Sequence, residues 1–236
     1  MEFSCTGSYL MGVDTVTCTG IHGKQNIQTA FQNSCNCAFA QLSESLGTEN
    51  LAHYVEKFAI TDSVVLDGIS TKTGNFEQDP SAVNVAWSAI GQFTDQVNPC
   101  AFLVFMGNIA SGGSGAKPYI LEKITIESPV TYEAQTQMNE PIMSEETAQL
   151  IKEYMRSNVS GKYGDWNFPG MTVCAKTGTG EVGGDKKPNA MFAGFVTDEQ
   201  YPIAFMVCVE DAGSGGTVCV PIASKVLAAC KEVLDS

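Results

Sequence analysis

The chain has 236 residues, enough to bury the core of one domain. Its formal net charge is −13 and it has no basic run, which argues against nucleic acid as a partner because phosphate binding depends on clustered Lys and Arg. The apolar stretches, such as 101–106, are far shorter than the ~20 residues that span a bilayer.

Nine cysteines are scattered along the chain without a CxxC pair, and there are two histidines. This pattern does not predict a zinc site, so we expect no metal and no organic cofactor. Most of the cysteines stand in apolar runs, where a free thiol behaves as a small buried hydrophobe. Cys5 and Cys18 bracket a short glycine-containing loop, and a disulfide between them is a hypothesis for a domain outside the cytoplasm.

The first half of the chain is expected to be mainly helical. Residues 1–24 hold four glycines among short polar and apolar stretches, which predicts loops with at most a small hairpin. Helical spacing over 26–46 is interrupted at Asn33-Ser34, so we expect a short helix, a break there, and a second helix opening near Asn36. A third helix is expected over 48–58.

The middle of the chain mixes the two kinds of element. Helices are expected over 81–89, from Asn98-Pro99 to the glycines at 112–113, and from Ser144 to about 157. Strands are expected over 118–126 and 130–134.

The last third predicts a sheet. Apolar segments at 171–179, 190–197 and 202–210 are close enough in sequence to pair as an antiparallel meander. The second and third are apolar on both alternating faces, which implies helices on both sides of the sheet. Pro221 is expected to begin the terminal helix, with a packing face formed by Ile222, Val226, Leu227, Cys230 and Leu234. These elements predict one α/β (α+β) domain. Residues 1–170 are expected to form a mostly helical subdomain with loops, and residues 171–236 the sheet strands and the terminal helix.

Lys176-Thr177-Gly178-Thr179 ends the first of these strands. The lysine supplies a charge, the threonines supply hydrogen-bond donors, and the glycine lets a second backbone approach, so this edge suits a peptide that ends in a carboxylate. An ordinary strand end with a solvated lysine remains the alternative. Ser34-Cys35-Asn36 can likewise present a hydroxyl and an amide to a cleft from the helix break, or be a polar helix cap.

Together the two motifs resemble the penicillin-binding transpeptidase and serine β-lactamase superfamily, whose motifs are SxxK, SxN and KTG. SxN is Ser34-Cys35-Asn36 and KTG is Lys176-Thr177-Gly178. The resemblance covers nearly the whole chain and implies a β-lactamase/transpeptidase-like fold, with an antiparallel sheet between helices and a mostly helical subdomain. Asn36 and the Ile90-Gly91-Gln92 segment favour a class B-like transpeptidase over a class D β-lactamase.

No SxxK motif precedes Ser34. The literal match at Ser114-Gly115-Ala116-Lys117 lies in a glycine-rich loop ended by Pro118, where the serine and lysine cannot share a helical face. We therefore expect that the nucleophile and the amino-terminal part of the fold are missing, and that the chain is an inactive carboxy-terminal portion of a larger protein.

The resemblance implies a role for each matched residue. Ser34 would relay a proton, Asn36 would hold the substrate amide, and Lys176 would favour anions. The hydroxyls of Thr177 and Thr179, with Gly178 between them, would bind the carboxylate of a D-Ala-D-Ala stem peptide or of a β-lactam. The parent would be anchored at the extracytoplasmic face of the cytoplasmic membrane, with other cell-wall synthesis proteins as partners, whereas this chain is expected to be soluble. Alternatives are a non-catalytic stem-peptide or partner-binding module, a β-lactamase, or a β-lactam sensor.

Overall fold

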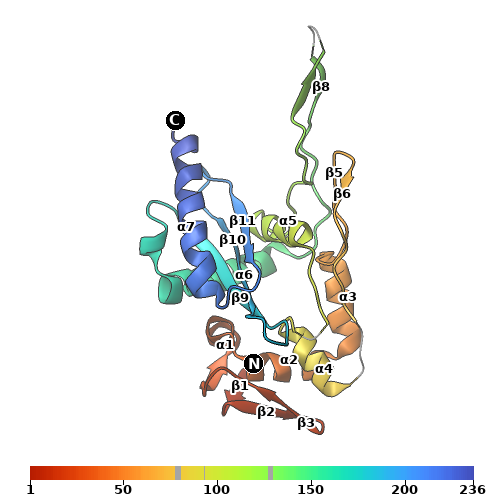
Figure 1. Ribbon diagram of the computed structural model, residues 1–236, viewed down its shortest axis with the longest axis vertical. Coiled ribbons are helices and arrows are strands. Elements are labelled where there is room, and N and C mark those ends of the chain that lie inside the picture. The colour runs from red at the N-terminus through yellow and green to blue at the C-terminus, as the bar shows by residue number, and fades with distance from the viewer. Residues whose placement is uncertain (78–80, 93, 127–129) are drawn as a thin grey trace.

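A three-stranded antiparallel sheet forms the centre of the carboxy-terminal part of the protein (Figure 1). The computed structural model describes residues 1–77, 81–92, 94–126 and 130–236. The strands are β9 (Val173–Gly180), β10 (Asn189–Val196) and β11 (Ala204–Val209), in the order β11-β10-β9. The predicted meander is confirmed.

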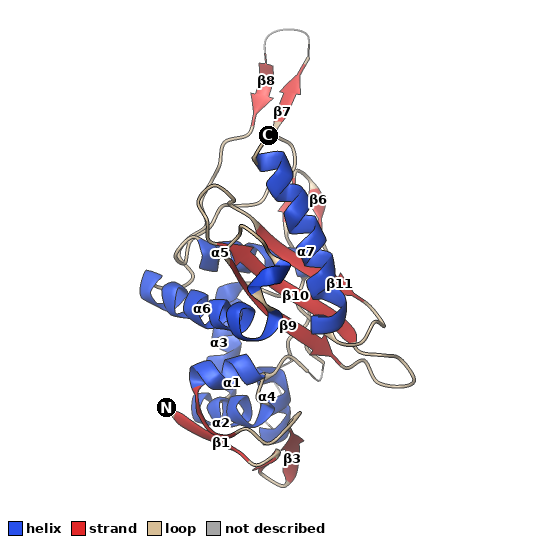
Figure 2. Ribbon diagram, turned by 90° about the vertical axis from the view of Figure 1, so that its left-hand side faces the viewer, coloured by secondary structure: helices blue, strands red, loops and turns tan. Residues whose placement is uncertain are grey.

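Helices cover both faces of this sheet, as predicted (Figure 2). On one face α7 (Gly215–Leu234) packs against alternate β10 residues such as Phe192. On the other, α5 (Pro99–Ala110) and α6 (Glu145–Asn158) pack against Phe195. Both phenylalanines are fully buried, which explains why β10 is apolar on both of its faces.

The start of α7 corrects a prediction. The helix begins at Gly215, six residues before Pro221, which lies exposed inside it. A Cβ on residue 215 would stand 2.3 Å from the carbonyl oxygen of Met191, so glycine allows the helix to start directly against β10. The buried face is consequently shifted and consists of Gly215, Cys219, Val220, Ala223 and Leu227. Of the predicted face, Leu227 is buried and Cys230 half-buried, whereas Ile222, Val226 and Leu234 are exposed.

The amino-terminal lobe consists of residues 1–58 and α4 (Ala82–Ala89). In Figure 1 residues 1–46 and α4 lie below the sheet, and residues 48–58 rise beside it on the right. Residues 1–26 are more regular than predicted and form four short strands. These are β1 (Glu2–Cys5) paired with β4 (Gly23–Asn26), and β2 (Ser8–Met11) paired with β3 (Asp14–Thr17). The three predicted helices are confirmed as α1 (Ile27–Asn33), α2 (Asn36–Leu46) and α3 (Thr48–Phe58).

Two hairpins extend from the other end of the molecule. They are β5 (Val65–Leu66) with β6 (Ile69–Ser70), and β7 (Lys123–Thr125) with β8 (Val130–Glu133). The strand predicted over 118–126 is therefore confirmed only at Lys123–Thr125, and the prediction is wrong for its first five residues. The N–H groups of Ile120 and Leu121 donate instead to the Asp67 carboxylate at 2.8 and 2.7 Å, so no partner strand binds them.

A π-helical turn (Val159–Tyr163) and a 3-10 turn (Asp165–Asn167) continue from α6 and were not predicted. Within the described ranges, no helix has the length and apolarity needed to cross a membrane. The division of the chain at residue 170 stays a prediction, and α5 and α6 on its amino-terminal side contribute directly to the core around the sheet.

Candidate active site

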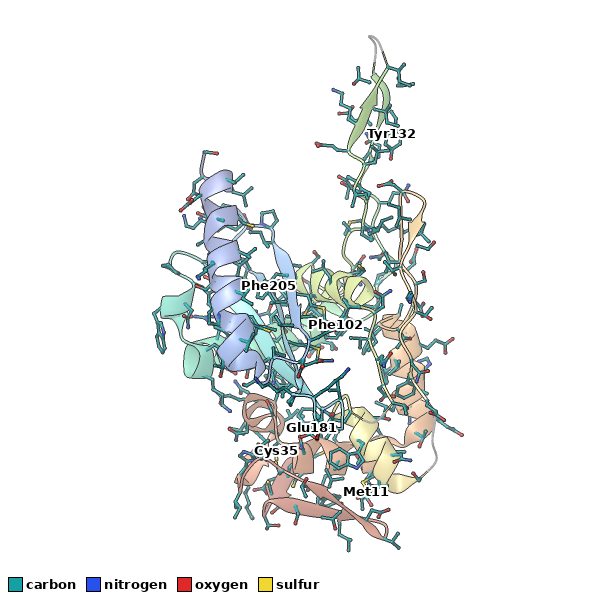
Figure 3. All side chains as sticks on the ribbon, viewed as in Figure 1. Met11, Cys35, Phe102, Tyr132, Glu181 and Phe205 are labelled. Carbon is teal, nitrogen blue, oxygen red and sulfur yellow. The ribbon has the colours of Figure 1, made fainter. Side chains whose placement is uncertain are left out.

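The structure brings the two sequence motifs together. The Nζ of Lys176, on β9, donates a hydrogen bond of 2.6 Å to the Oγ of Ser34, at the break between α1 and α2. Figure 3 labels Cys35, the neighbour of Ser34, and Glu181, the residue after β9, where the amino-terminal lobe meets the sheet. The candidate site therefore lies at this boundary.

Ser34 is held out of the helix by its backbone. Its φ of 50° and ψ of 48° are left-handed, a conformation that costs a non-glycine residue about 1 kcal/mol or more. The N–H groups of Ser34 and Cys35 donate to the carbonyls of Phe31 and Ala30, which closes α1. Cys35 then caps α2, and the exposed Ser34 side chain is left facing β9. Backbone strain of this kind clusters at functional sites.

Asn36 is the first residue of α2, and its side chain is bound to the lobe. Its Nδ2 donates to the carbonyl of Thr17 at 2.9 Å. No hydrogen bond joins Asn36 to Ser34 or Lys176 within the part of the chain that the structure describes. Asn36 thus lies beside the site while fixing the start of α2 to the end of β3.

Lys176 is half-buried and its charge is disfavoured. Burial, and secondarily the positive charge of Lys162, lower the pKa of Lys176 to about 8. Its Nζ also donates to the carbonyl of Thr177 at 2.8 Å and lies 5.8 Å from the ring centre of Phe31. The ammonium is therefore oriented toward Ser34 and remains mostly protonated at neutral pH.

Tyr163, on the π-helical turn, orients Thr177. Its hydroxyl accepts the Thr177 N–H at 3.0 Å and lies 2.9 Å from the Thr177 Oγ1. The Thr177 N–H thus points away from β10, toward the unpaired edge of β9. Because the N–H groups of every second residue in a strand point the same way, the N–H of Thr179 also points to this edge. The motifs gave no signal for Tyr163, because its contact depends on how the turn after α6 packs.

Two further residues support the strand that carries the KTG motif. Gln92 donates to the carbonyl of Thr179 at 3.0 Å and accepts the N–H of Glu181 at 3.2 Å. Asn158 is fully buried and donates to the carbonyl of Ala175 at 3.2 Å, just before Lys176. Gln92 belongs to the Ile90-Gly91-Gln92 segment of the family resemblance, which gave it no role, and no sequence pattern singled out Asn158.

Gly178 lies between the two threonines against Met191, whose side chain would be 3.3 Å from an added Cβ. The backbone N–H of Gly215 lies 3.4 Å from the hydroxyl of Thr179, so the start of α7 also reaches this edge.

As predicted, the four residues from Ser114 to Lys117 do not form a helical turn. This segment follows α5 as a loop, in which the Ser114 hydroxyl donates to the carbonyl of Asn139 at 2.5 Å and the Lys117 N–H to that of Gln137. It therefore lacks the geometry of an SxxK motif.

The match to a family model identifies the class. Residues 4–228 match the penicillin-binding protein transpeptidase domain, so the chain belongs to that family. Curated relatives include the peptidoglycan D,D-transpeptidase PbpA of Mycolicibacterium smegmatis, 27% identical over 86% of this chain and 43% of the relative. Another is the stage V sporulation protein D of Bacillus subtilis, 29% identical over 88% of this chain and 34% of the relative. The chain thus spans less than half the length of these relatives.

Solved structures share the fold. Penicillin-binding protein A of M. tuberculosis, in a ceftriaxone acyl-enzyme complex, has a TM-score of 0.87 at 21% identity, over 98% of this chain and 55% of that one. The D,D-transpeptidase domain of a peptidoglycan glycosyltransferase from Eggerthella lenta has a TM-score of 0.84 at 21% identity, over 99% and 60%. The predicted fold class, a mixed helix and strand transpeptidase-like domain, is confirmed.

Proposed function

We propose that the chain forms the substrate-binding wall of a penicillin-binding D,D-transpeptidase, which cross-links peptidoglycan stem peptides through an acyl-serine intermediate. The observation that carries the proposal is the hydrogen bond of 2.6 Å between Lys176 and Ser34, which unites the KTG and SxN motifs in a chain of this family. Curated relatives that bear the name D,D-transpeptidase support the same activity.

The nucleophile of this reaction would be the serine of an SxxK motif in a longer protein, because none precedes Ser34 in these residues. That serine would attack the carbonyl of the penultimate D-Ala and break the bond to the terminal D-Ala. The proton that it loses would reach the departing amine through Ser34. Since Lys176 donates to the Ser34 oxygen, the Ser34 hydroxyl hydrogen is free to point to the substrate.

The edge of β9 would hold the substrate. The hydroxyls of Thr177 and Thr179 would bind the terminal carboxylate, and the N–H of Thr179 would be one donor to the oxyanion. Gly178 would let the peptide backbone lie close to the strand. Asn36 would hold the substrate amide with its carbonyl oxygen, because its Nδ2 is engaged by Thr17.

β-Lactams would enter the same site, because their carboxylate imitates that of the stem peptide. The acyl-enzyme complexes of penicillin-binding protein A with ceftriaxone and imipenem support this inference for a chain of the same fold. The site would work on the extracytoplasmic face of the membrane, where its substrate lies, and other cell-wall synthesis proteins would be its neighbours.

A non-catalytic binding module is the second candidate, because the KTG edge and Ser34 can bind a carboxylate-ended peptide without forming a covalent bond. The test uses a stem pentapeptide that ends in D-Ala-D-Ala. Transpeptidase function predicts that the protein extended upstream of Met1 carries an SxxK helix, becomes acylated and releases D-Ala. An extended protein without SxxK that binds the peptide reversibly would favour the binding module. Rapid turnover of a β-lactam would favour a β-lactamase.

A further inference from the structure

Four side chains that could bind a metal converge in the amino-terminal lobe. They are Cys5, Cys18, His22 and Cys35, and their ligand atoms all lie within 4.8 Å of one another. The absence of CxxC and the scarcity of histidine had argued against a zinc site. The four donors come from separate segments, namely β1, the end of β3, the approach to β4, and the break between α1 and α2, so no short sequence motif joins them.

Three of the six distances between the ligand atoms match the edges of a zinc tetrahedron. Bonds of ~2.3 Å to sulfur and ~2.05 Å to nitrogen place two sulfurs about 3.8 Å apart, and a sulfur and a nitrogen about 3.6 Å apart. The Sγ atoms of Cys18 and Cys35 are 3.8 Å apart. The Nδ1 of His22 lies 3.5 Å from the Sγ of Cys5 and 3.5 Å from that of Cys18.

Only weak thiol hydrogen bonds hold this arrangement together: the Cys5 thiol donates to the carbonyl of Gly20 at 3.4 Å, and the Cys18 thiol donates to the Sγ of Cys35 at 3.8 Å. The Nδ1 of His22 is equidistant from the sulfurs of Cys5 and Cys18, and in either tautomer it can share only one hydrogen with the two of them. Thiols are also weak donors and gain little from such contacts. A central cation would give all four groups one common partner.

The surroundings suit a structural site. Cys5 and Cys35 are fully buried, whereas Cys18 and His22 are half-buried and leave a route of entry. The strands that supply the donors have only four residues each, so the lobe has little sheet of its own to fix them.

We propose that Cys5, Cys18, His22 and Cys35 bind one zinc ion in a closed, tetrahedral, structural site. All four positions are taken by the protein, so the ion binds no substrate. Cys35 is the middle residue of Ser34-Cys35-Asn36, and the ion therefore fixes the break that presents Ser34 to Lys176. Metal binding is thereby linked to folding of the lobe and to the geometry of the candidate active site.

The test measures metal in the purified protein. We expect about one zinc ion per chain after purification without chelator, and cobalt added to the stripped protein should give the intense visible absorption of a tetrahedral thiolate site. Cys35→Ser and His22→Gln should lose the zinc and the cobalt spectrum. Cys37→Ser is the matched control, because Cys37 is a buried neighbour outside the tetrahedron, and it should retain both.

A chelator should lower the melting temperature of the wild type and of Cys37→Ser, and leave that of Cys35→Ser unchanged. Three outcomes would overturn the proposal. One is a reduced wild-type protein that binds no zinc and gives no tetrahedral cobalt spectrum. Another is a Cys37→Ser variant that loses metal as completely as Cys35→Ser does. The third is alkylation of Cys5 and Cys18 only after reduction, which would show that the two form a disulfide.

Discussion

Lys176 and Ser34 are 142 positions apart in the chain and are joined by a hydrogen bond of 2.6 Å. One lies on the sheet and the other on the amino-terminal lobe, so this contact ties together the two parts of the molecule that enclose the candidate site. Both residues are in energetically unfavourable states: the Lys176 ammonium is half-buried, and the backbone of Ser34 is in the left-handed region. Both can be tested separately.

Lys176 should make the stability of the protein depend on pH. Its pKa is lowered to about 8 from an ordinary 10.5, so between these values the unfolded chain binds more protons than the folded one. Stability should therefore rise by about 2 kcal/mol from pH 8 to pH 10 because of this group. Urea unfolding of Lys176→Met should lack that part of the rise, whereas Lys186→Met should keep it. Equal pH profiles for wild type and Lys176→Met would refute the shift.

The left-handed backbone of Ser34 should distinguish two small substitutions. Ser34→Gly removes the hydroxyl and relieves the strain, whereas Ser34→Ala removes the hydroxyl and keeps it. We expect Ser34→Gly to be more stable than Ser34→Ala by about 1 kcal/mol in urea unfolding. An alanine variant at least as stable as the glycine variant would mean that the break has another conformation.

Tyr163→Phe should weaken the KTG strand. The change leaves the Thr177 N–H and hydroxyl without their shared partner, which should cost about 1–2 kcal/mol of stability. Tyr54→Phe, on the exposed face of α3, should cost little under the same conditions. Equal unfolding free energies for the two variants would show that the Tyr163 hydroxyl does not support Thr177.

At the junction between α7 and the sheet, position 215 should tolerate only glycine, whereas the adjacent position 216 should also accept alanine. A Cβ at residue 215 would stand 2.3 Å from the Met191 carbonyl oxygen and 2.5 Å from that of Gly178, so Gly215→Ala must shift backbone. We expect a loss of about 3 kcal/mol or more. At Gly216 the nearest neighbour is the Ser214 Oγ at 3.8 Å, and Gly216→Ala should be neutral or slightly stabilising. Comparable losses for both variants would contradict this packing.

Local patterns predicted the elements well where the signal lies within the element. Asn33-Ser34 interrupts a helical period, and the apolar segments from Met171 onward pair with their sequence neighbours, so the α1–α2 break and the meander could both be foreseen. The start of α7 could not, because Pro221 is a local signal for a helix start while the close fit at Gly215 is a tertiary one.

The motifs of the candidate site were predictable because a family resemblance joins them across the chain. The residues that support those motifs were not. Tyr163, Gln92 and Asn158 reach β9 through packing that no spacing in the sequence reveals. The cluster around His22 was missed for the same reason, because its ligands are neighbours in space and not in a short motif.

Labelling with a fluorescent penicillin tests the proposed function most directly. We expect no covalent label on the 236-residue chain, and a stable label on the protein extended upstream of Met1 through an SxxK segment. Lys176→Ala in the extended protein should reduce the rate of labelling about 100-fold or more, while Lys186→Ala should not. Covalent labelling of the 236-residue chain itself, or an extended Lys176→Ala variant that labels as fast as the wild type, would contradict the account.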